Sequence, residues 1–418
     1  MTKTYQLKTP PKEALGVETY LAPPPPAQGK IIGLDCHPDT FTAAVFVGQT
    51  PHDARKVGSR ENLGLQALLG WAAKEFGPQD LFVLEASSNS FELCTRLHAL
   101  GLRAVVLESC HIGKHAKTYA DNDKMAAARI ALVFLAGNAP CVWVPDEQSR
   151  QRRELLHAYG KAVADHTAAS NSLRGYLNGN AIRPAKGNLE LESTRQWMLK
   201  QRDWSPMQKE ILAEHFGELD ACKERRKRLY RLIAAEMSGQ PMMLRSMKVL
   251  GVGLVNAFAL LAVIGDVRRF QRPEKLVAYI GLNPGQRQSG TGKNINLGVG
   301  KRGRGDIRHL LIQGAQAVLR MGRATALGQW GWKLFARKGN RNVAVAAVAR
   351  KLLVQVWHML SGNPPTALET DKSFTLKLHK LAVVLGASLR RELRLGDTLP
   401  ACIQTLRSRA LQPANIAP

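Results

Sequence analysis

Short apolar runs alternate with helical patterns from residue 30 to about residue 145. Lys30–Leu34 and Thr40–Val47 are β-rich runs separated by a short turn. Leu81–Leu84 and Arg103–Leu107 are short apolar runs of the kind that form buried strands. Apolar residues at helical spacing predict helices over Glu61–Phe76, Phe91–Leu100 and Asp123–Ala136. This alternation predicts an α/β domain with a mostly parallel sheet and helical cover.

From about residue 146 the pattern becomes helical. Ser149–Leu177 and Leu189–Leu232 carry long helical stretches with no convincing strand, which predicts a charged helical hairpin or coiled coil. Leu244–Leu319 has the pattern of compact helices joined by Gly turns, and Phe374–Leu385 predicts a further helix. We therefore expect an all-α C-terminal region.

Pattern and composition together divide the chain into five expected parts. The first, residues 1–29, is polar and Pro-rich and predicts an extended N-terminal segment. The others are an α/β domain at 30–145, a helical coiled-coil linker at 146–235, a helical C-terminal domain at 240–345 and a basic helical tail at 346–418.

The charge of the chain narrows the class of partner. It has 59 Lys and Arg against 33 Asp and Glu, a formal net charge of +26, and 45% of its residues are hydrophobic, which excludes a disordered chain. So large a charge favours DNA or RNA as partner, with an anionic membrane as the weaker alternative. The N-terminus lacks a signal-peptide core, no apolar run reaches the ~20 residues that span a bilayer, and the six cysteines form no CxxC pair. We expect a cytoplasmic protein with reduced thiols, no structural zinc and no membrane partner.

Acidic residues stand at the ends of predicted strands and at a helix start. Asp35 ends the first strand, Glu85 follows Leu81–Leu84, and Asp121 and Asp123 precede or open a helix. Because sites in open α/β sheets form at the carboxyl ends of strands, Asp35 and Glu85 are expected to lie close together. Clustered carboxylates repel one another and need a cation, and Mg²⁺ prefers such oxygen ligands. Ordinary strand-end and helix-capping acids are the alternative interpretation.

This order of strands and helices is that of the ribonuclease H-like fold. Two metal ions held by carboxylates can clamp the attacking and leaving oxygens of a phosphoryl displacement. The acidic positions therefore favour metal-dependent phosphoryl-transfer chemistry.

A second segment, Gly281–Arg308, is rich in glycine and in basic residues. Basic side chains beside accessible backbone N–H groups form an anion cradle that suits a nucleic-acid backbone. A serine hydroxyl in such a loop, here Ser289, can attack a phosphorus atom when a metal or arginine stabilises the oxyanion. An ordinary basic loop is the alternative interpretation. The candidate phosphate-binding residues are Arg287, Lys293, Lys301, Arg302, Arg304 and Arg308.

Several motifs give the chain a family resemblance over roughly residues 30–340. The N-terminal ones read IIGLDCHPDTF, FVLEASSNS and NDKMAAARIA, and the C-terminal ones follow the order GD-x-x-RF, Y-x-GL-x-PG, SG-x-GK and KRG. With them the chain resembles the DEDD-type transposases of insertion-sequence family 110, particularly its 1111 subgroup of bridge-RNA-guided recombinases. The resemblance implies a RuvC-like (RNase H-like) N-terminal domain and a helical C-terminal domain with an essential serine, which matches Ser289.

The resemblance also implies four acids in the pattern Asp, Glu, Asp-x-x-Asp. The first three match Asp35, Glu85 and Asp123, which would hold Mg²⁺ or Mn²⁺, but the fourth falls on Ala126. Three alternatives follow: Asp121 takes over, Asp123 and water suffice, or this copy is impaired. Residues i and i+2 do not share a helix face, so Asp121 serves only if it precedes the helix.

The implied activity is strand exchange through a transient serine–DNA phosphodiester at Ser289. The implied partners are donor and target DNA, a structured guide RNA, and further copies of the chain in dimers that pair into a tetramer, in the bacterial cytoplasm at the nucleoid. In guided systems base pairing reads the sequence and the protein reads duplex shape and backbone. The alternatives are a RuvC-like metal-dependent nuclease without serine chemistry and a catalytically impaired nucleic-acid-binding protein.

Overall fold

A computed structural model describes residues 28–109, 112, 122–137, 140–183, 189–287, 295–300 and 303–412. The residues form two compact units, divided between Asp146 and Glu147. The predicted site residues Asp121, Ser289, Lys293, Lys301 and Arg302 lie outside the described residues, as does most of the predicted N-terminal segment at 1–29.

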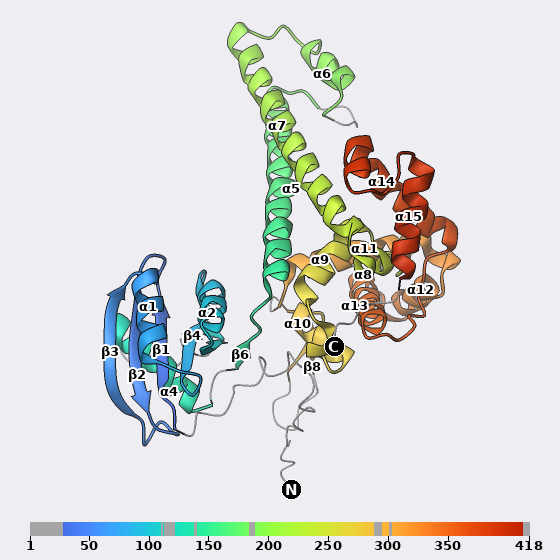
Figure 1. The fold of residues 1–418 in the computed structure, drawn as a ribbon. Coiled ribbons are helices and arrows are strands. Elements are labelled where there is room, and N and C mark those ends of the chain that lie inside the picture. The colour runs from blue at the N-terminus through green and yellow to red at the C-terminus, as the bar shows by residue number, and fades with distance from the viewer. Residues whose placement is uncertain are drawn as a thin grey trace. The chain divides into compact units, whose positions relative to one another are not determined.

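The first unit is a six-stranded sheet with helices on both faces (Figure 1). Its elements are β1 (Ile31–Cys36), β2 (Phe41–Val47), β3 (Arg55–Leu63), α1 (Leu65–Glu75), β4 (Leu81–Glu85), α2 (Ser90–Ala99), β5 (Arg103–Leu107), α4 (Asp123–Leu135) and β6 (Cys141–Val142). The strand order β3-β2-β1-β4-β5-β6 is that of an RNase H-like domain, as the element order predicted.

The expectation of a mostly parallel sheet is wrong. β4 pairs in parallel with β1 and with β5, whereas β2 runs antiparallel to both β1 and β3, and β6 runs antiparallel to β5. β3 escaped clear prediction because its residues, RKVGSRENL, are mostly exposed and polar and show no apolar alternation. It takes the first residues of the helix expected from Glu61, so α1 begins only at Leu65.

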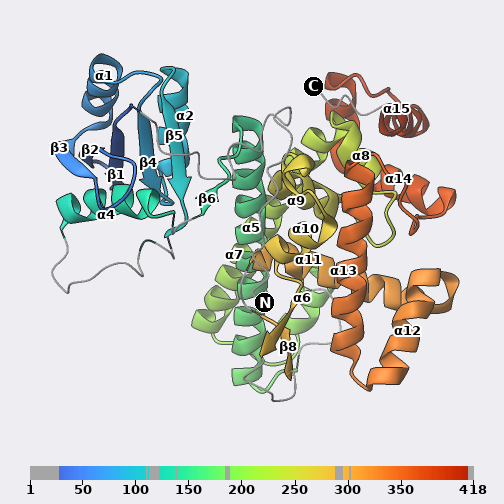
Figure 2. The ribbon, with the colours of Figure 1, turned by 90° about the horizontal axis from the view of Figure 1, so that it is seen from below.

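Two apolar layers pack on the two faces of this sheet. α1 and α2 cover one face, where Leu68 and Leu97 meet Phe82 of β4, and α4 covers the other, where Ile130 and Phe134 belong to the core (Figure 2). Alternate residues of the buried strands contribute to opposite layers, as the two-residue period of a strand requires. The buried strands thus have apolar side chains on both faces.

Gly33 in β1 allows α4 to lie unusually close to the sheet. A Cβ atom at this position would stand 2.1 Å from the carbonyl oxygen of Ala127 and 3.1 Å from the Cβ of Ala131. Both of these alanines are fully buried. The glycine and the small helix residues therefore set the distance between α4 and the strand that ends at Asp35.

The second unit is mainly helical. Its elements are α5 (Glu147–Gly179), α6 (Glu192–Leu199), α7 (Pro206–Ser238), α8 (Pro241–Ser246), α9 (Leu254–Ile264), η1 (Val267–Arg269), α10 (Pro273–Ile280), β7 (Pro284–Arg287), β8 (Ile295–Val299), α11 (Gly305–Met321), η2 (Gly322–Ala324), α12 (Ala326–Lys338), α13 (Arg341–Leu360), α14 (Asp371–Glu392) and α15 (Leu399–Leu411). β7 and β8 pair as an antiparallel hairpin, a short exception to the all-α expectation. A pairing of so few, Gly-rich residues gives no strand periodicity to detect.

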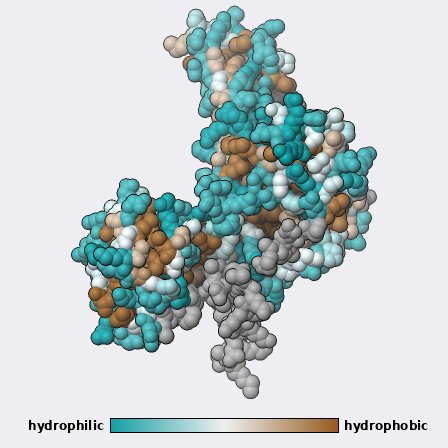
Figure 3. Space-filling model, viewed as in Figure 1, coloured by the Kyte–Doolittle hydropathy of each residue, from teal (hydrophilic) through white to brown (hydrophobic). Residues whose placement is uncertain are grey.

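α5 and α7 form the long helical hairpin that the sequence predicts. The ring centroids of Tyr159 and Tyr230 lie 5.9 Å apart, and those of Tyr176 and His215 lie 5.3 Å apart. Because the later residue of α5 meets the earlier residue of α7, the two helices run antiparallel. Hydrophilic residues dominate the visible face of this hairpin, with smaller apolar patches between them (Figure 3). This is the surface expected of two charged helices that share one apolar seam.

One core extends through the rest of the second unit. It includes Ile233 of α7, Phe258 of α9, Leu311 of α11, Leu353 of α13 and Leu406 of α15. The stretch expected as a basic tail from residue 346 therefore contributes buried side chains to the same core as the helices before it. The expected divisions near residues 235–240 and 345 are not separations between compact units among the described residues.

α13 is the one described helix that is long and apolar enough, by length and composition, to cross a membrane. Its buried residues, which include Val348, Leu352 and Val356, belong to the core shared with α9 and α11. Packing inside the unit accounts for the apolar composition of this helix.

Replacing Gly33 tests how closely α4 must approach β1. We expect Gly33→Ala to destabilise the first unit by about 1–3 kcal/mol, because the added methyl group overlaps helix backbone that cannot move alone. Hydrogen–deuterium exchange should show faster exchange at the amides of β1 and α4. Gly70→Ala in α1 is the matched control, since a Cβ there meets nothing within 4 Å. Gly70→Ala should stabilise the first unit by about 0.4–1 kcal/mol. Equal amide protection of β1 and α4 in the Gly33→Ala and Gly70→Ala variants would contradict the close approach of α4 to Gly33.

Candidate functional site

The register of β1 and β4 brings two predicted acids to one edge of the sheet. Leu34 pairs with Leu84 in parallel, so Asp35 and Glu85 follow at the carboxyl ends of adjacent strands. The carboxylates interact, because the charge of Asp35 is one cause of the raised pKa of Glu85. The pairing predicted from the sequence for Asp35 and Glu85 is therefore present.

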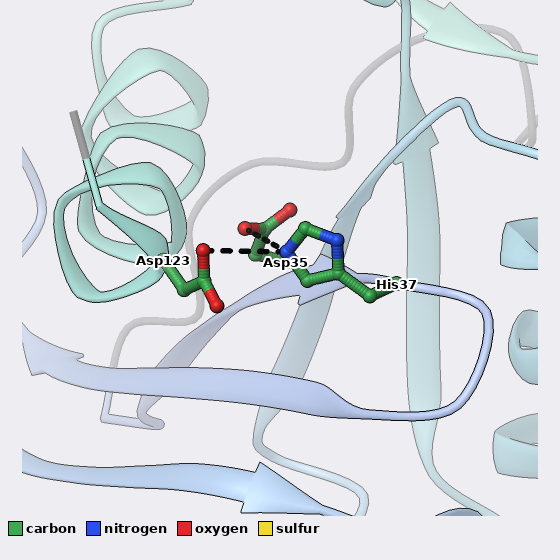
Figure 4. A group of neighbouring side chains, drawn as sticks. All are labelled: Asp35, His37 and Asp123. Atoms are coloured by element: carbon green, nitrogen blue, oxygen red, sulfur yellow. Dashed lines mark ion pairs between the residues drawn. The ribbon is translucent and has the colours of Figure 1, made fainter.

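The third predicted acid reaches the same place from α4. Asn122 caps this helix by accepting a hydrogen bond from the Met125 N–H, so Asp123 is its first residue. The imidazole Nε2 of His37 lies 3.3 Å from Asp35 Oδ2 and 3.3 Å from Asp123 Oδ1 (Figure 4). The three side chains come from the end of β1, the loop after it and the start of α4.

Burial, and to a lesser degree repulsion, raises the pKa values of Asp35 and Glu85. Burial is the main cause of the raised pKa of Asp35; His37 lowers that pKa, and the charge of Asp123 raises it again. Glu85 has a raised pKa for the same main reason, with Asp35 adding to the rise and Arg129 opposing it. The pKa of the intervening Cys36 rises to about 12, through burial and the charges of Asp35 and Glu85. Repulsion among the carboxylates is thus a second cause of these shifts, after burial.

The arrangement fits a divalent cation. One ligand atom each from Asp35, His37 and Asp123 lie within 4.8 Å of one another, and Glu85 is their neighbour on β4. A cation there would offset both the burial and the repulsion that raise the pKa values of Asp35 and Glu85. Carboxylate oxygens suit Mg²⁺ and Mn²⁺, and an imidazole nitrogen adds preference toward the transition metal.

The fourth acid of the family pattern is absent from this helix position. Ala126 lies three residues after Asp123 in α4 and is half-buried. A side chain at i+3 shares the face of residue i, so a carboxylate at 126 would point to the same side as Asp123. Asp121, the alternative from the sequence, lies outside the described residues.

The C-terminal motifs meet at the root of the β7–β8 hairpin. Gly281 ends α10 in the left-handed conformation, and Gly303, at φ 85°, packs so closely that a Cβ on it would stand 2.8 Å from Gly281 N. Arg308 donates to the carbonyl oxygens of Ile280 and Gly281, each at 3.3 Å. Ser289, with residues 288–294, belongs to the segment between the two strands.

Two of the six predicted phosphate-binding residues have described side chains. Arg304 makes a two-point ion pair with Asp306, with N···O distances of 3.0 and 2.6 Å, and Arg308 holds the end of α10. Arg287 lies in β7, but its side chain, like Lys293, Lys301 and Arg302, is outside the described part of the chain. Both described arginines thus also organise the root of the hairpin.

Sequence reasoning missed His37 and one basic stretch. Asp35 and His37 are two residues apart at a strand end, which is the spacing of a shared face and the only signal for the histidine. Between Asp306 and Glu369 the chain has no Asp or Glu but nine Lys and Arg. In this stretch Trp330 and Trp332 are 36% and 43% exposed rather than core residues. An acid-free run with exposed aromatic rings has the composition of a segment that binds nucleic acid.

Matches to known proteins cover both the acidic site and the C-terminal motifs. A model of the Transposase IS116/IS110/IS902 family matches residues 243–329, and an IS110-type DEDD model described as Transposase matches residues 32–181. The chain is 27% identical over 287 residues to the transposase for insertion sequence element IS1111A of Coxiella burnetii, covering 67% of this chain and 77% of that protein. It is 29% identical over 294 residues to a "Probable family 20 transposase" of Pseudomonas aeruginosa, covering 68% and 85%.

Removing one carboxylate tests the cation site. The raised pKa of Asp35 means that the folded state keeps a proton at pH values where the unfolded state has lost it. In the absence of metal, the free energy of unfolding therefore falls as the pH rises above the ordinary Asp value of 3.8. Asp35→Asn should flatten this fall and raise the unfolding temperature without metal. Mg²⁺ or Mn²⁺ at ten times its Kd should stabilise the unaltered protein by about 1.4 kcal/mol and the variant not at all.

Thermal unfolding from about pH 4 to about pH 8, with and without metal, measures both effects. Asp39→Asn is the matched control, because Asp39 is exposed in the same β1–β2 connection. Metal-dependent stabilisation that persists in Asp35→Asn, or disappears equally in Asp39→Asn, would remove Asp35 from the site.

Proposed function

We propose that this chain, which belongs to the IS110/IS1111 family of transposases, cleaves and rejoins DNA strands through a transient phosphodiester between Ser289 and DNA. The convergence of Asp35, His37 and Asp123 beside Glu85 is the observation that carries the proposal. A transposase is a phosphoryl-transfer enzyme that binds DNA. The acidic side chains at the carboxyl ends of β1 and β4 and at the start of α4 are the ones that could hold a metal ion for this reaction.

The acids and the serine have separate tasks in the proposed reaction. The hydroxyl oxygen of Ser289 attacks a backbone phosphorus, the bond to a deoxyribose oxygen breaks, and the serine proton is lost while the leaving oxygen gains one. A deoxyribose hydroxyl of the partner strand then attacks the same phosphorus and releases the serine. A divalent metal bound by Asp35, Asp123 and Glu85 would supply charge stabilisation at the phosphoryl oxygens. His37 would add its imidazole nitrogen to these ligands.

The distribution of Lys and Arg along the chain supports DNA as a partner and is compatible with RNA as a second one. The acid-free stretch between Asp306 and Glu369 covers α11, α12 and α13, with Trp330 and Trp332 exposed among its cations. We propose that this cationic surface also serves a structured guide RNA, that copies of the chain assemble as dimers and tetramers, and that the reaction takes place on DNA in the bacterial cytoplasm. Binding to either polyanion should weaken steeply with salt.

Replacing the serine tests the covalent step. Ser289→Ala protein, mixed with guide RNA and both DNAs, should form no covalent protein–DNA adduct on a denaturing gel, because the methyl side chain has no nucleophilic oxygen. The control is Thr291→Ala, which removes a neighbouring hydroxyl from the same basic segment and should leave the adduct intact. Undiminished adduct in Ser289→Ala would remove Ser289 from the mechanism, and strand cleavage that persists in this variant without any adduct would favour hydrolysis by a RuvC-like nuclease.

A second candidate function is that of a catalytically impaired nucleic-acid-binding protein. It is favoured by the alanine at position 126, where the family pattern has its fourth acid. Ala126→Asp would place a carboxylate on the Asp123 side of α4, where it can join the cation site. We expect this variant to raise the strand-cleavage rate, by about tenfold if it contributes 1.4 kcal/mol to the transition state. Cleavage by Ala126→Asp alone, with none by the natural sequence, would establish the binding protein. Ala128→Asp, on another face of α4, is the control.

A further inference from the structure

The side chain of Asn89 joins two loops at the edge of the sheet where the acidic residues lie. Asn89 stands at the start of α2, and its amide nitrogen Nδ2 donates a hydrogen bond of 2.8 Å to the carbonyl oxygen of His37. The two residues are 52 positions apart in the sequence. This bond therefore ties the loop after β4 to the loop after β1, which carries one of the candidate metal ligands.

Asn89 does not use its side chain in the way that its place at a helix start would predict. Asn is a preferred N-cap residue because its side-chain oxygen can accept a hydrogen bond from the first turn, which typically stabilises by about 1 kcal/mol. Asn89 is the N-cap of α2, yet its side chain makes no such bond. Its Oδ1 instead accepts from Ser87 Oγ at 3.1 Å. The amide thus serves the contact with His37 rather than its own helix.

The loop that carries Asn89 is itself held firmly. The N–H of Ser87 donates to Ser90 Oγ at 3.0 Å, and Ser90 Oγ donates back to the carbonyl oxygen of Ser87 at 3.1 Å. Ser90 is fully buried. The N–H of Ala86 donates to the carbonyl oxygen of Leu107, the last residue of β5, at 2.9 Å. Asn89 therefore offers His37 a fixed point of attachment.

His37 depends on its backbone for its position. Its side chain is 46% exposed, so burial does not fix the ring. The N–H of His37 donates to the carbonyl oxygen of Thr40 at 3.0 Å, and its own carbonyl oxygen accepts from Asn89. With both main-chain groups bonded, the imidazole starts from a fixed backbone, and Nε2 lies 3.3 Å from an oxygen of Asp35 and of Asp123 (Figure 4).

We propose that Asn89 is a positioning residue, which holds His37 in place as a metal ligand beside Asp35 and Asp123. The inference rests on the proposed function, in which the acidic site binds a divalent metal. A carbonyl oxygen can only accept, so the side chain at position 89 must donate to keep the contact. Asn89 acts through His37 and is not itself a ligand. Residues that orient metal ligands in this way typically contribute about 10- to 100-fold to metal affinity.

The test measures Mn²⁺ binding to the full chain without nucleic acid, by isothermal titration calorimetry. Asn89→Ala should weaken binding by about tenfold, because the loop that carries His37 loses its attachment. Ser88→Ala is the matched control, since Ser88 is an exposed residue of the same loop. It should leave the Kd for Mn²⁺ unchanged.

A double-mutant cycle separates positioning of His37 from a general structural role. If Asn89 acts through His37, the two substitutions are not additive. His37→Ala should weaken Mn²⁺ binding at least as much as Asn89→Ala, and adding Asn89→Ala to His37→Ala should cause no further loss. A general loosening of the sheet edge would instead weaken binding by the same factor in both backgrounds.

Electron spin echo spectra of the bound Mn²⁺ report the ligand directly. The natural protein and Ser88→Ala should show coupling of the metal to an imidazole nitrogen. His37→Ala should lose this coupling, and Asn89→Ala should weaken it. Additive losses in the cycle, coupling and Kd unchanged in Asn89→Ala, or no Mn²⁺ binding by the natural protein would each overturn the inference.

A second variant keeps the test valid if thermal unfolding without metal shows that Asn89→Ala does not fold. Ser87→Ala removes the hydroxyl that donates to Asn89 Oδ1 and leaves the Asn89 amide in the chain. Its Mn²⁺ affinity and its nitrogen coupling should both fall, because the amide is no longer oriented. A Kd and a coupling equal to those of Ser88→Ala would then overturn the inference.

This inference and the serine chemistry fail separately. Covalent adduct formation by the natural protein, with Mn²⁺ binding unaffected in Asn89→Ala, would remove the positioning role and leave the proposed reaction of Ser289. Nitrogen coupling that depends on Asn89, in a protein that forms no adduct, would keep the positioning role and overturn the serine step.

Discussion

The contact between α4 and β1 at Gly33 is the constraint on which the acidic site depends. Asp35 ends the strand and Asp123 begins the helix, so their separation is set by how closely these two elements pack. A side chain at Gly33 would meet the backbone at Ala127, and the helix would have to move away with Asp123. His37 can touch both aspartates only because that distance is short. A packing requirement in an apolar layer thus fixes the position of charged groups at its edge.

Burial and charge act together on the acids of the first unit. Burial is the main cause of the raised pKa values of Asp35 and Glu85, and a neighbouring carboxylate adds to each rise. A cation bound at this edge would favour the ionised form of both groups.

The sequence predicted the parts of the fold and site that rest on periodicity and on strand ends. The pairing of Asp35 with Glu85 follows from two apolar runs that end in an acid, and the arrival of Asp123 follows from a helix that starts there. The only signal for His37 is its spacing of two residues from Asp35 at a strand end, because a single histidine after a strand otherwise looks like any loop residue. β3 was obscure because an exposed edge strand needs no apolar alternation.

The two outer strands of the sheet limit how copies of this protein can associate. β3 presents mostly exposed polar residues, with Lys56 and Arg60 among them, and the opposite border, β6, is only two residues long. Charged or very short borders discourage backbone pairing with a neighbouring molecule. Cross-β aggregation through this sheet is therefore disfavoured from both sides.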